Sequence, residues 1–204
     1  VNAAKGILNQ TQSPTMSANV INQKTEEVKR TKDALDGNQR LEAAKQQALN
    51  HLNTLNDLNN AQRVDSIKQA NDTDNLKDLS QIVSTASDLN NSMSELKAKL
   101  KETVNPVKSS INYINADYDL KRQFNKAIKD AREALSKTKG ANLNERDIQG
   151  LSQAIDSTKD ALNGEQRLAE AKEKSKQFIK QLDTLNNAQN NYLTNEINKS
   201  DNIK

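Results

Sequence analysis

Nearly the same eleven-residue string occurs twice in the chain, as TKDALDGNQRL at residues 31–41 and as TKDALNGEQRL at residues 158–168. A shift of 127 positions aligns residues 1–77 with residues 128–204 without a gap, and 17 of the 32 positions between residues 31 and 62 are identical. Periods of this length are typical of repeat arrays, in which each unit packs only against its neighbours. We therefore expect an array of similar units instead of one globule, and we interpret the chain as a segment of a longer one.

The composition limits the size of any core. Only 33% of the 204 residues are hydrophobic, 2% are aromatic and none is cysteine, so we expect thin aliphatic cores without disulfides. The formal net charge is +3, and no basic face is interleaved with aromatic residues, so we expect no nucleic-acid partner. No apolar run approaches the roughly 18 residues that span a bilayer, so we also expect no membrane insertion.

Apolar residues recur at steps of three and four along the chain, which is the spacing of one helical face. One such stripe consists of Leu120, Phe124, Ala127, Ile128, Ala131 and Leu135. Between Leu79 and Leu100 the spacing becomes a heptad pattern, which predicts a long helix from near Asp74 to near Thr103. The two seam positions are Leu79, Ala86, Met93 and Leu100, and Ile82, Leu89 and Leu96. At about 1.5 Å per residue this helix would be roughly 45 Å long, which is more than a compact small bundle requires.

Two residue pairs in the repeated string have the spacing of a capping box, in which a short polar side chain accepts from the third helical N–H and a Gln reaches back. The pairs are Asp36 with Gln39, and Asn163 with Gln166. Gly37 and Gly164 would then lie in a tight junction between helices. Alternatively, both glycines cap the preceding helix in the left-handed conformation.

Further helix boundaries follow from the same chemistry. Asn59 with Gln62, and Asn186 with Gln189, repeat the capping-box spacing inside a second shared string, LNNAQ. Pro106 predicts an interruption, since proline disfavours helical geometry at the residue before it. The polar run at residues 71–75 lacks the central Gly and terminal Glu of a calcium loop and is typical of a helix-capping turn.

These signals predict an all-α fold of tandem three-helix bundles, joined end to end into an elongated rod with a long connecting helix. The expected units are a partial bundle at residues 1–37, a bundle at 38–103 that ends in the long helix, a bundle at 104–164, and a partial bundle at 165–204. A long helix that runs into the next bundle would fix the direction of successive units.

The sequence contains no constellation that predicts catalysis, cofactor binding or metal binding, so we expect no enzyme. His51 is the only histidine, and its partner in the repeat is Phe178. A position that takes either residue beside an apolar stripe is typical of a packing site. The five glycines form no phosphate-binding loop.

Ligand-contacting residues are not identified by the sequence. Tyr113, Tyr118 and Tyr192 are candidates for an exposed anchor, although a partly buried place at a helix edge is the more common role, and Phe124 and Phe178 fit core stripes. A local positive stretch consists of Lys97, Lys99, Lys101 and Lys108. A lysine near the C-terminal end of a helix interacts favourably with the helix dipole, and we interpret these lysines as structural.

The residues from Tyr118 to Gly164, which read YDLKRQFNKAIKDAREALSKTKGANLNERDIQGLSQAIDSTKDALNG, resemble a FIVAR module, and VNAAKGILNQT at the N-terminus resembles the end of another. Residues 41–87 resemble a GA module, the three-helix albumin-binding type, with the pattern LxxAKxxAxxxL. Both modules together resemble the repeat region of giant staphylococcal cell-surface proteins. The predicted units are then FIVAR-like at 1–37 and 104–164 and GA-like at 38–103 and 165–204.

The resemblance implies a cell-wall-associated surface protein that binds host extracellular matrix such as fibronectin. Albumin-binding relatives present aromatic residues on the second helix of the GA module, whereas here residues 59–70 contain none. We therefore do not expect albumin binding by this copy.

Three functions fit the sequence. The first is a structural and adhesive spacer, monomeric and semi-rigid, whose weak contacts are multiplied over many copies. The second is a dedicated binding module for a host protein such as albumin or immunoglobulin. The third is an intracellular spectrin-like scaffold, which would depend on the heptads of the long helix.

Overall fold

The computed structural model describes residues 2–9 and 17–203, and these residues form helices and loops without a strand. Residues 10–16 of the first predicted unit, together with Val1 and Lys204, lie outside the described residues. The helices are α1 (Asn2–Leu8), α2 (Ala18–Asp33), α3 (Gly37–Thr54), α4 (Asn60–Asp72), α5 (Leu76–Lys108), α6 (Ile111–Ile114), α7 (Tyr118–Ala134), α8 (Glu145–Asp160), α9 (Gly164–Lys180) and α10 (Asn187–Lys199).

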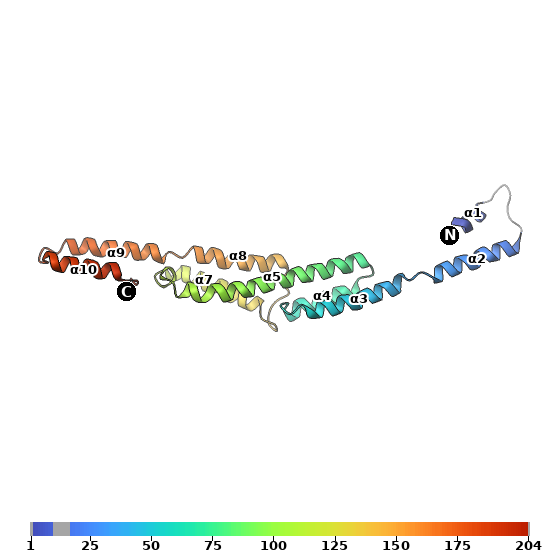
Figure 1. The fold of residues 1–204 in the computed structure, drawn as a ribbon, viewed down its shortest axis with the longest axis horizontal. Helices are drawn as coiled ribbons and strands as arrows, with labels where there is room; N and C mark the ends of the chain where they lie inside the picture. The colour runs from blue at the N-terminus through green and yellow to red at the C-terminus, as the bar shows by residue number, and fades with distance from the viewer. Residues whose placement is uncertain (1, 10–16, 204) are drawn as a thin grey trace.

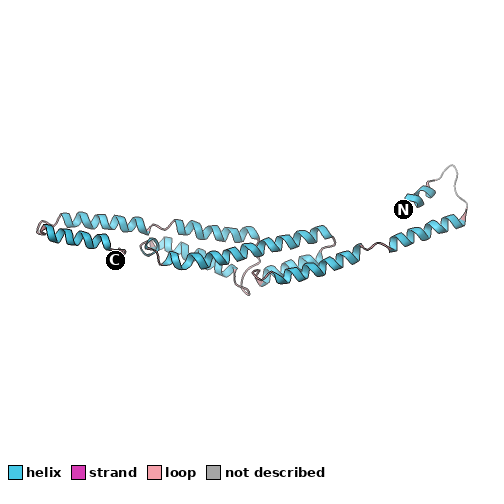
Figure 2. Ribbon diagram, viewed as in Figure 1, coloured by secondary structure: helices cyan, strands magenta, loops and turns pink. Residues whose placement is uncertain are grey.

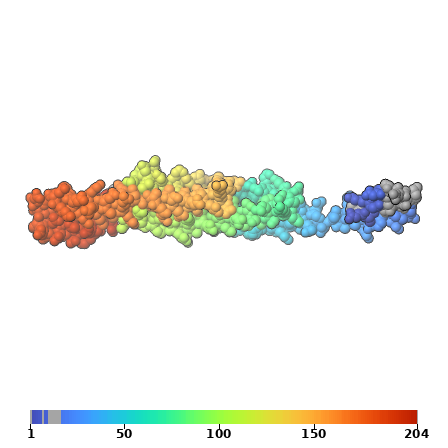
Figure 3. All heavy atoms as spheres, turned by 90° about the horizontal axis from the view of Figure 1, so that it is seen from above, coloured from blue at the N-terminus to red at the C-terminus, as the bar shows by residue number. Residues whose placement is uncertain are grey.

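The helices form a long, narrow rod whose termini lie towards opposite ends (Figure 1). All of them run along the rod axis, with short loops at the turns (Figure 2). Helices α2, α3, α8 and α9 follow one another along the axis, and at about 1.5 Å per residue they account for roughly 100 Å of length. The space-filling view shows the same narrow outline from a second direction (Figure 3). The predicted all-α rod of chained helical bundles is confirmed.

Helix α5 belongs to two three-helix bundles. It packs against α3 and α4 along its first half and against α7 and α8 along its second half (Figure 1). Its buried apolar residues include six of the seven predicted seam positions, and the seventh, Ile82, packs against the core. At 33 residues, α5 is somewhat longer than predicted. Because one uninterrupted helix serves both bundles, their relative direction is fixed.

The predicted interruption before Pro106 is wrong. Pro106 lies inside α5, and the helix continues to Lys108. A proline removes one hydrogen bond of the helical ladder, but Val104 is buried and Val107 packs against the core. Burial of these two side chains outweighs the missing backbone bond.

Each bundle has a small core. Leu52, Leu58 and Met93 are fully buried in the first bundle (α3, α4 and the first half of α5), and Phe124 and Ile148 are buried in the second. The ring of Tyr113 meets that of Phe124 edge-on, with centroids 5.9 Å apart. Full burial of one such side chain stabilises the fold by about 1.5–3 kcal/mol, so a few residues hold each bundle together.

The described chain has a helix pair at each end, and only the start of the second pair is contacted by another helix, the short α6. Helix α1 packs against α2, and α9 packs against α10. In the repeat alignment α2 corresponds to α8, and the exposed fraction of Ile21 is 45%, compared with 0% for its counterpart Ile148. Residues of α2 that correspond to core positions of the complete bundle are therefore exposed in this pair.

Candidate functional site

Polar side chains gather at two places where loops of neighbouring units meet. In the first, which we call the central joint, residues 135–144 between α7 and α8 lie against residues 55–59 between α3 and α4. In the second, the distal joint, residues 163–167 at the start of α9 lie against residues 112–117 around α6. These joints determine how successive units are aligned, so we treat them as the candidate functional site of a spacer.

Asn59 and Gln62 form the centre of the central joint and are almost completely buried. The Asn59 Oδ1 accepts from the Gln62 backbone N–H at 2.9 Å, and the Gln62 Oε1 accepts from the Asn59 N–H at 3.0 Å. The predicted capping box is thus confirmed, as is its repeat at Asn186 and Gln189.

The same two side chains also bind the other unit. The Asn59 Nδ2 donates to the carbonyls of Ala134 at 3.2 Å and Ala141 at 2.9 Å, and the Gln62 Nε2 donates to the carbonyl of Leu143 at 2.8 Å. Each amide therefore satisfies a helix end with its oxygen and the facing loop with its nitrogen. The capping spacing in the sequence did not predict this second set of bonds.

Charged groups surround the central joint. The Lys137 Nζ donates to the carbonyls of Leu58, at 2.7 Å, and Asn56, and partial burial lowers the pKa of this lysine. Asp57 forms an ion pair with Lys97 at 2.9 Å. The Lys97 ammonium holds the pKa of the Asp57 carboxyl below its ordinary value.

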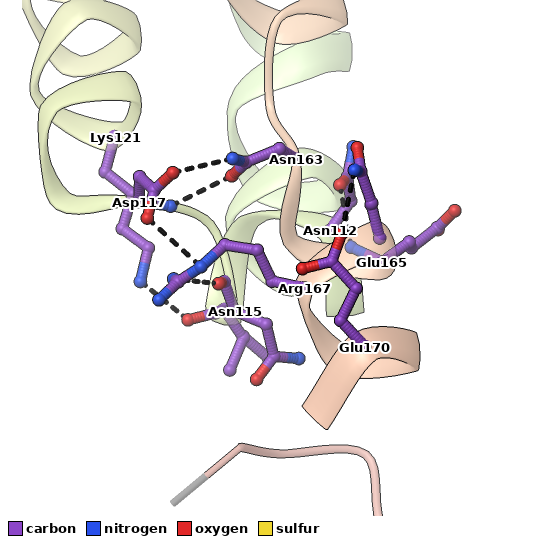
Figure 4. Close-up of polar contacts among 10 residues, drawn as sticks. Asn112, Asn115, Asp117, Lys121, Asn163, Glu165, Arg167 and Glu170 are labelled. Carbon is purple, nitrogen blue, oxygen red and sulfur yellow. Dashed lines mark hydrogen bonds and ion pairs between the residues drawn. The ribbon is translucent and has the colours of Figure 1, made fainter. Parts of the chain in front are cut away.

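The distal joint is centred on Asn163 and Asp117 (Figure 4). The Asp117 backbone N–H donates to Asn163 Oδ1 at 3.0 Å, and Asn163 Nδ2 donates to Asp117 Oδ2 at 2.7 Å. Arg167 pairs with Asp117 at 3.0 Å and donates to the Asn115 carbonyl at 2.6 Å. The Glu165 N–H, at the start of α9, donates to the Asn112 side chain at 3.1 Å.

The capping boxes predicted in the eleven-residue string are wrong. Neither Asp36 nor Asn163 makes a side-chain capping bond, and Gln166 binds Glu170 instead. At Asn163 the side-chain amide has a better alternative, because Asp117 offers it both a donor and an acceptor. One N–H in the first turn of α9, that of Glu165, is satisfied across the joint by the Asn112 side chain.

The glycines of the string do not adopt the left-handed conformation, so the predicted C-terminal caps are also wrong. Gly164 is needed for close approach, because a Cβ at this position would lie 2.1 Å from the Asn112 carbonyl oxygen and 2.6 Å from the Ala116 nitrogen. A Cβ on Gly37 would meet nothing within 4 Å.

Asn115 extends the distal joint to the end of the described chain. Its Nδ2 donates to the Asp201 carbonyl at 2.9 Å, and its Oδ1 accepts from the Ile203 N–H at 3.0 Å. In the repeat alignment Ile203 corresponds to Leu76, the first residue of α5. The loop around α6 therefore holds both the start of α9 and the segment that corresponds to the start of α5.

The predicted packing role of His51 and Phe178 is wrong. His51 is exposed, and its Nε2 lies 3.0 Å from the Ser87 Oγ. The Ser87 hydroxyl donates its hydrogen to the Val83 carbonyl, so the histidine is the donor in its contact with Ser87. This hydrogen bond links α3 to α5. The exposed fraction of Phe178 is 62%. Both residues lie next to the apolar stripe of their helix in sequence, but neither is buried.

The tyrosines and lysines singled out in the sequence differ in how far they are buried. Tyr113 is partly buried as predicted and shares a hydrogen bond with Asn125, whereas Tyr118 and Tyr192 are exposed. Lys97 pairs with Asp57, and Lys99 pairs with Asp156 of α8. Two lysines of the positive stretch thus contribute one ion pair to each bundle.

The described residues contain no group of three or more histidine, cysteine, aspartate or glutamate side chains placed to hold a metal ion. Within the same residues no helix has both the length and the apolar character needed to cross a membrane. All buried side-chain nitrogen and oxygen atoms described here have a hydrogen-bond partner. The chemistry of the joints is therefore that of fully paired amides, and it is suited to rigidity.

Comparison with known protein families shows that the two kinds of unit match two families, the FIVAR domain and the GA module. The model of the FIVAR domain matches residues 1–36 and 92–163, which is more than half of the chain, and the model of the GA module matches residues 38–92 and 165–204. The chain belongs to the FIVAR domain family. The boundary between its GA and FIVAR matches falls at residue 92, inside α5, so the helix that joins the two bundles is divided between the two families.

Proteins with similar sequences are found in staphylococci. The chain is 38% identical, over its whole length, to the extracellular matrix-binding protein ebh of Staphylococcus aureus strain MW2, and 37% identical over 97% of its length to EbhB of strain Newman. It spans only 2% and 3% of those two proteins.

Two solved structures from this family are similar. A crystal structure of a domain of EbhA from Staphylococcus aureus has a TM-score of 0.88 at 28% identity, and covers 99% of this chain and 81% of that one. A second structure, from work on adherence to fibronectin mediated by the extracellular matrix-binding protein Embp of Staphylococcus epidermidis, has a TM-score of 0.56 at 25% identity, and covers 61% of this chain and 98% of that one.

Proposed function

We propose that this FIVAR–GA segment is a structural and adhesive spacer of a bacterial cell-surface protein, associated with the cell wall and without a catalytic role. The observation that carries the proposal is the continuity of α5 through two bundles, supported by the two paired joints. A chain whose units are aligned by a shared helix and by fixed loops holds its ends apart. In this proposal extension along the rod is the function of the segment.

The adhesive part of the proposal derives from the relatives. Their names describe matrix binding, and one similar structure is associated with adherence to fibronectin. We propose that the segment, as a monomer, contacts a host matrix protein such as fibronectin weakly, and that many copies provide strength. Multivalency raises avidity by about 10² to 10⁴ without a strong single site, so no hot spot is required on one repeat.

We also propose the unit boundaries 1–37, 38–103, 104–164 and 165–204. In this division the boundary between residues 103 and 104 falls inside α5, which runs to Lys108 and packs against helices of both units. Limited proteolysis of the chain tests the other two boundaries, since cleavage should concentrate in the loops at residues 34–36 and 161–163 and spare α5.

Surface-immobilised fibronectin tests the adhesive role. We expect the single chain to dissociate rapidly and a covalent tandem of four copies to dissociate much more slowly, because only the tandem makes several contacts at once. Equal dissociation rates for one and four copies would contradict the proposal. Submicromolar binding of the single chain to albumin or immunoglobulin would favour a dedicated binding module instead.

A scaffold function is distinguished by self-association. A spectrin-like scaffold would associate through its helices, whereas a spacer remains monomeric. Sedimentation equilibrium of the chain over a hundredfold range of concentration separates the two, and an increase in apparent mass would favour the scaffold.

A further inference from the structure

Asn163 and Gly164 form a chemically reactive pair at the centre of the distal joint. Of the five glycines in the sequence, only Gly164 follows an asparagine. The side-chain carbonyl carbon of an asparagine is open to attack by the backbone nitrogen of the next residue, and a glycine shields that nitrogen least because it has no side chain. Asparagine is accordingly among the thermolabile residues that heat-adapted proteins avoid. Since the joint requires Gly164 for close approach, its packing places the reactive pair there.

The reaction of this pair needs only water as a co-reactant. The Gly164 nitrogen forms a bond to the Asn163 Cγ, the bond from Cγ to Nδ2 breaks, and ammonia leaves with the proton of the Gly164 N–H. The product is a five-membered succinimide ring. Water then adds to one of the two ring carbonyls and opens the ring, which leaves either an aspartate or an isoaspartate. In the isoaspartate the main chain runs through the former side chain and is one carbon longer.

The closed joint holds Asn163 away from the geometry of this reaction. Its Oδ1 accepts from the Asp117 N–H at 3.0 Å, and its Nδ2 donates to Asp117 Oδ2 at 2.7 Å. Both ends of the amide are therefore engaged by a residue 46 positions away, and Gly164 is buried. Ring closure requires the side chain to leave Asp117 and turn towards its own backbone. The joint must open locally before the reaction can occur.

The first copy of the eleven-residue string has the same local geometry without these contacts. The backbone angles are φ −104° and ψ 8° at Asp36, and φ −119° and ψ 17° at Asn163. Asp36 is exposed, its side chain makes no capping bond, and the space around Gly37 is open. An asparagine introduced at position 36 would therefore form the same reactive pair in a similar backbone, but without the protection of the joint.

Conversion of Asn163 to an acid changes its contact with Asp117. The acid has no N–H to donate, so a carboxylate oxygen would take the place of the Nδ2 that now lies 2.7 Å from Asp117 Oδ2. Two carboxylates at this distance repel each other. Arg167 pairs with the other oxygen of Asp117 at 3.0 Å, and it offsets only part of the repulsion because one cation faces two anions. The added carbon of an isoaspartate also displaces the start of α9.

We propose that Asn163 is a site of spontaneous deamidation that the closed distal joint protects, and that its conversion to an acid releases α9 from the loop around α6. An opening of the joint that lasts long enough thus leaves a permanent chemical change. The modification turns a stiff joint of the rod into a flexible one. The central joint contains no asparagine followed by glycine, so it is not affected.

The test uses the whole chain with Asp36→Asn, which carries the reactive pair in both copies of the string. Trypsin, which cleaves after lysine and arginine, releases residues 33–40 and 160–167 as matched peptides, and mass spectrometry follows the conversion of amide to acid in each during incubation at neutral pH. Position 163 should react roughly four- to a hundredfold more slowly than position 36, because two hydrogen bonds each slow opening by about two- to tenfold. In urea the two rates should become equal.

A substitution of the facing carboxylate tests the source of the protection. Asp117→Ala removes the acceptor of the Asn163 Nδ2 and should raise the rate at position 163 by about two- to tenfold. Asp119→Ala is the matched control, since Asp119 is exposed and pairs with Arg122 within α7. This control should leave the rate at position 163 unchanged.

The distance distribution between spin labels on α8 and α9 tests the consequence. Asn163→Asp should broaden the distribution. Asn163→Asp combined with Asp117→Asn should narrow it again, because the pair of amide and carboxylate is restored with its members exchanged. The proposal is overturned if position 163 reacts as fast as position 36 in the folded chain, if it does not react in urea, or if Asn163→Asp leaves the distribution as narrow as in the parent.

Discussion

Replacement of Gly164 by alanine tests the distal joint. A Cβ on Gly164 would lie 2.1 Å from the Asn112 carbonyl oxygen and 2.6 Å from the Ala116 nitrogen. Both are backbone atoms that cannot rotate away, so the start of α9 must move off the loop around α6. Gly37 has the same local sequence and open space around it, which makes Gly37→Ala the matched control.

The magnitude follows from the contacts that this movement breaks. Three hydrogen bonds cross the joint at Asn163 and Glu165, each worth about 0.5–1.5 kcal/mol net. The exposed pair of Arg167 with Asp117 adds about 0–1 kcal/mol. Replacement of a helical glycine returns up to about 1 kcal/mol at either position. Gly164→Ala should therefore weaken docking of α9 by about 1–4 kcal/mol, whereas Gly37→Ala should be neutral or slightly stabilising.

The assay is the distance distribution between spin labels on α8 and α9. The chain has no native cysteine, so labels can be attached at Gln153 and Lys174, which are both exposed. We expect a narrow distribution in the parent and in Gly37→Ala, and a broad one in Gly164→Ala with the melting of the central bundles unchanged. An equally narrow distribution in Gly164→Ala would refute the assignment of Gly164 to close approach at a rigid joint.

Further predictions concern the central joint. Asn59→Ala should lower the free energy of unfolding by about 2–4 kcal/mol, because it removes a cap and leaves two carbonyls without donors. Its counterpart Asn186→Ala should cost about 1 kcal/mol, since that exposed side chain only caps α10; equal losses in urea denaturation would contradict the double role of Asn59. The pKa of Asp57 is lowered from its ordinary value of 3.8 in the folded state, so the stabilisation it contributes is present above the unfolded pKa and is lost as pH falls through the folded pKa. Asp57→Asn should therefore reduce the acid dependence of unfolding below about pH 4, and an unchanged pH profile would show that the pair with Lys97 contributes nothing.

The sequence predicted the elements that depend on local periodicity. The heptads from Leu79 to Leu100 lie in one helix with six of their seven seam residues buried, and the caps at Asn59 and Asn186 form as expected. Both signals are local, since a helical stripe and a capping box are each contained within one element. The rod followed from the repeat together with the length of α5.

The contacts that the eleven-residue string makes across the distal joint could not be predicted. Its spacing was compatible with capping, and the competing partner, Asp117, lies 46 positions away along the chain. Nothing inside the string indicates that Asn163 will bind Asp117 instead of its own helix. The sequence did offer one signal of a close contact, which is Gly164. A glycine at the start of a helix does not need a positive φ there, so its lack of a side chain points to a neighbouring segment that packs closely against it.

The exposed positions were mispredicted for a similar reason. Phe178 is apolar and lies next to a stripe, but its side chain is exposed, as is that of His51 in the complete bundle. Pro106 was predicted to break a helix whose flanking valines are held by tertiary packing. In each case contacts between elements overrode a local preference.

Small-angle X-ray scattering of the chain in solution tests the central claim most directly, namely that the shared helix and the paired joints hold the units end to end. A rod of roughly 100 Å, from the combined rise of the helices along its axis, should have a radius of gyration of about 30 Å. A compact chain of 204 residues would have a radius of gyration near 17 Å, and that value would contradict the account.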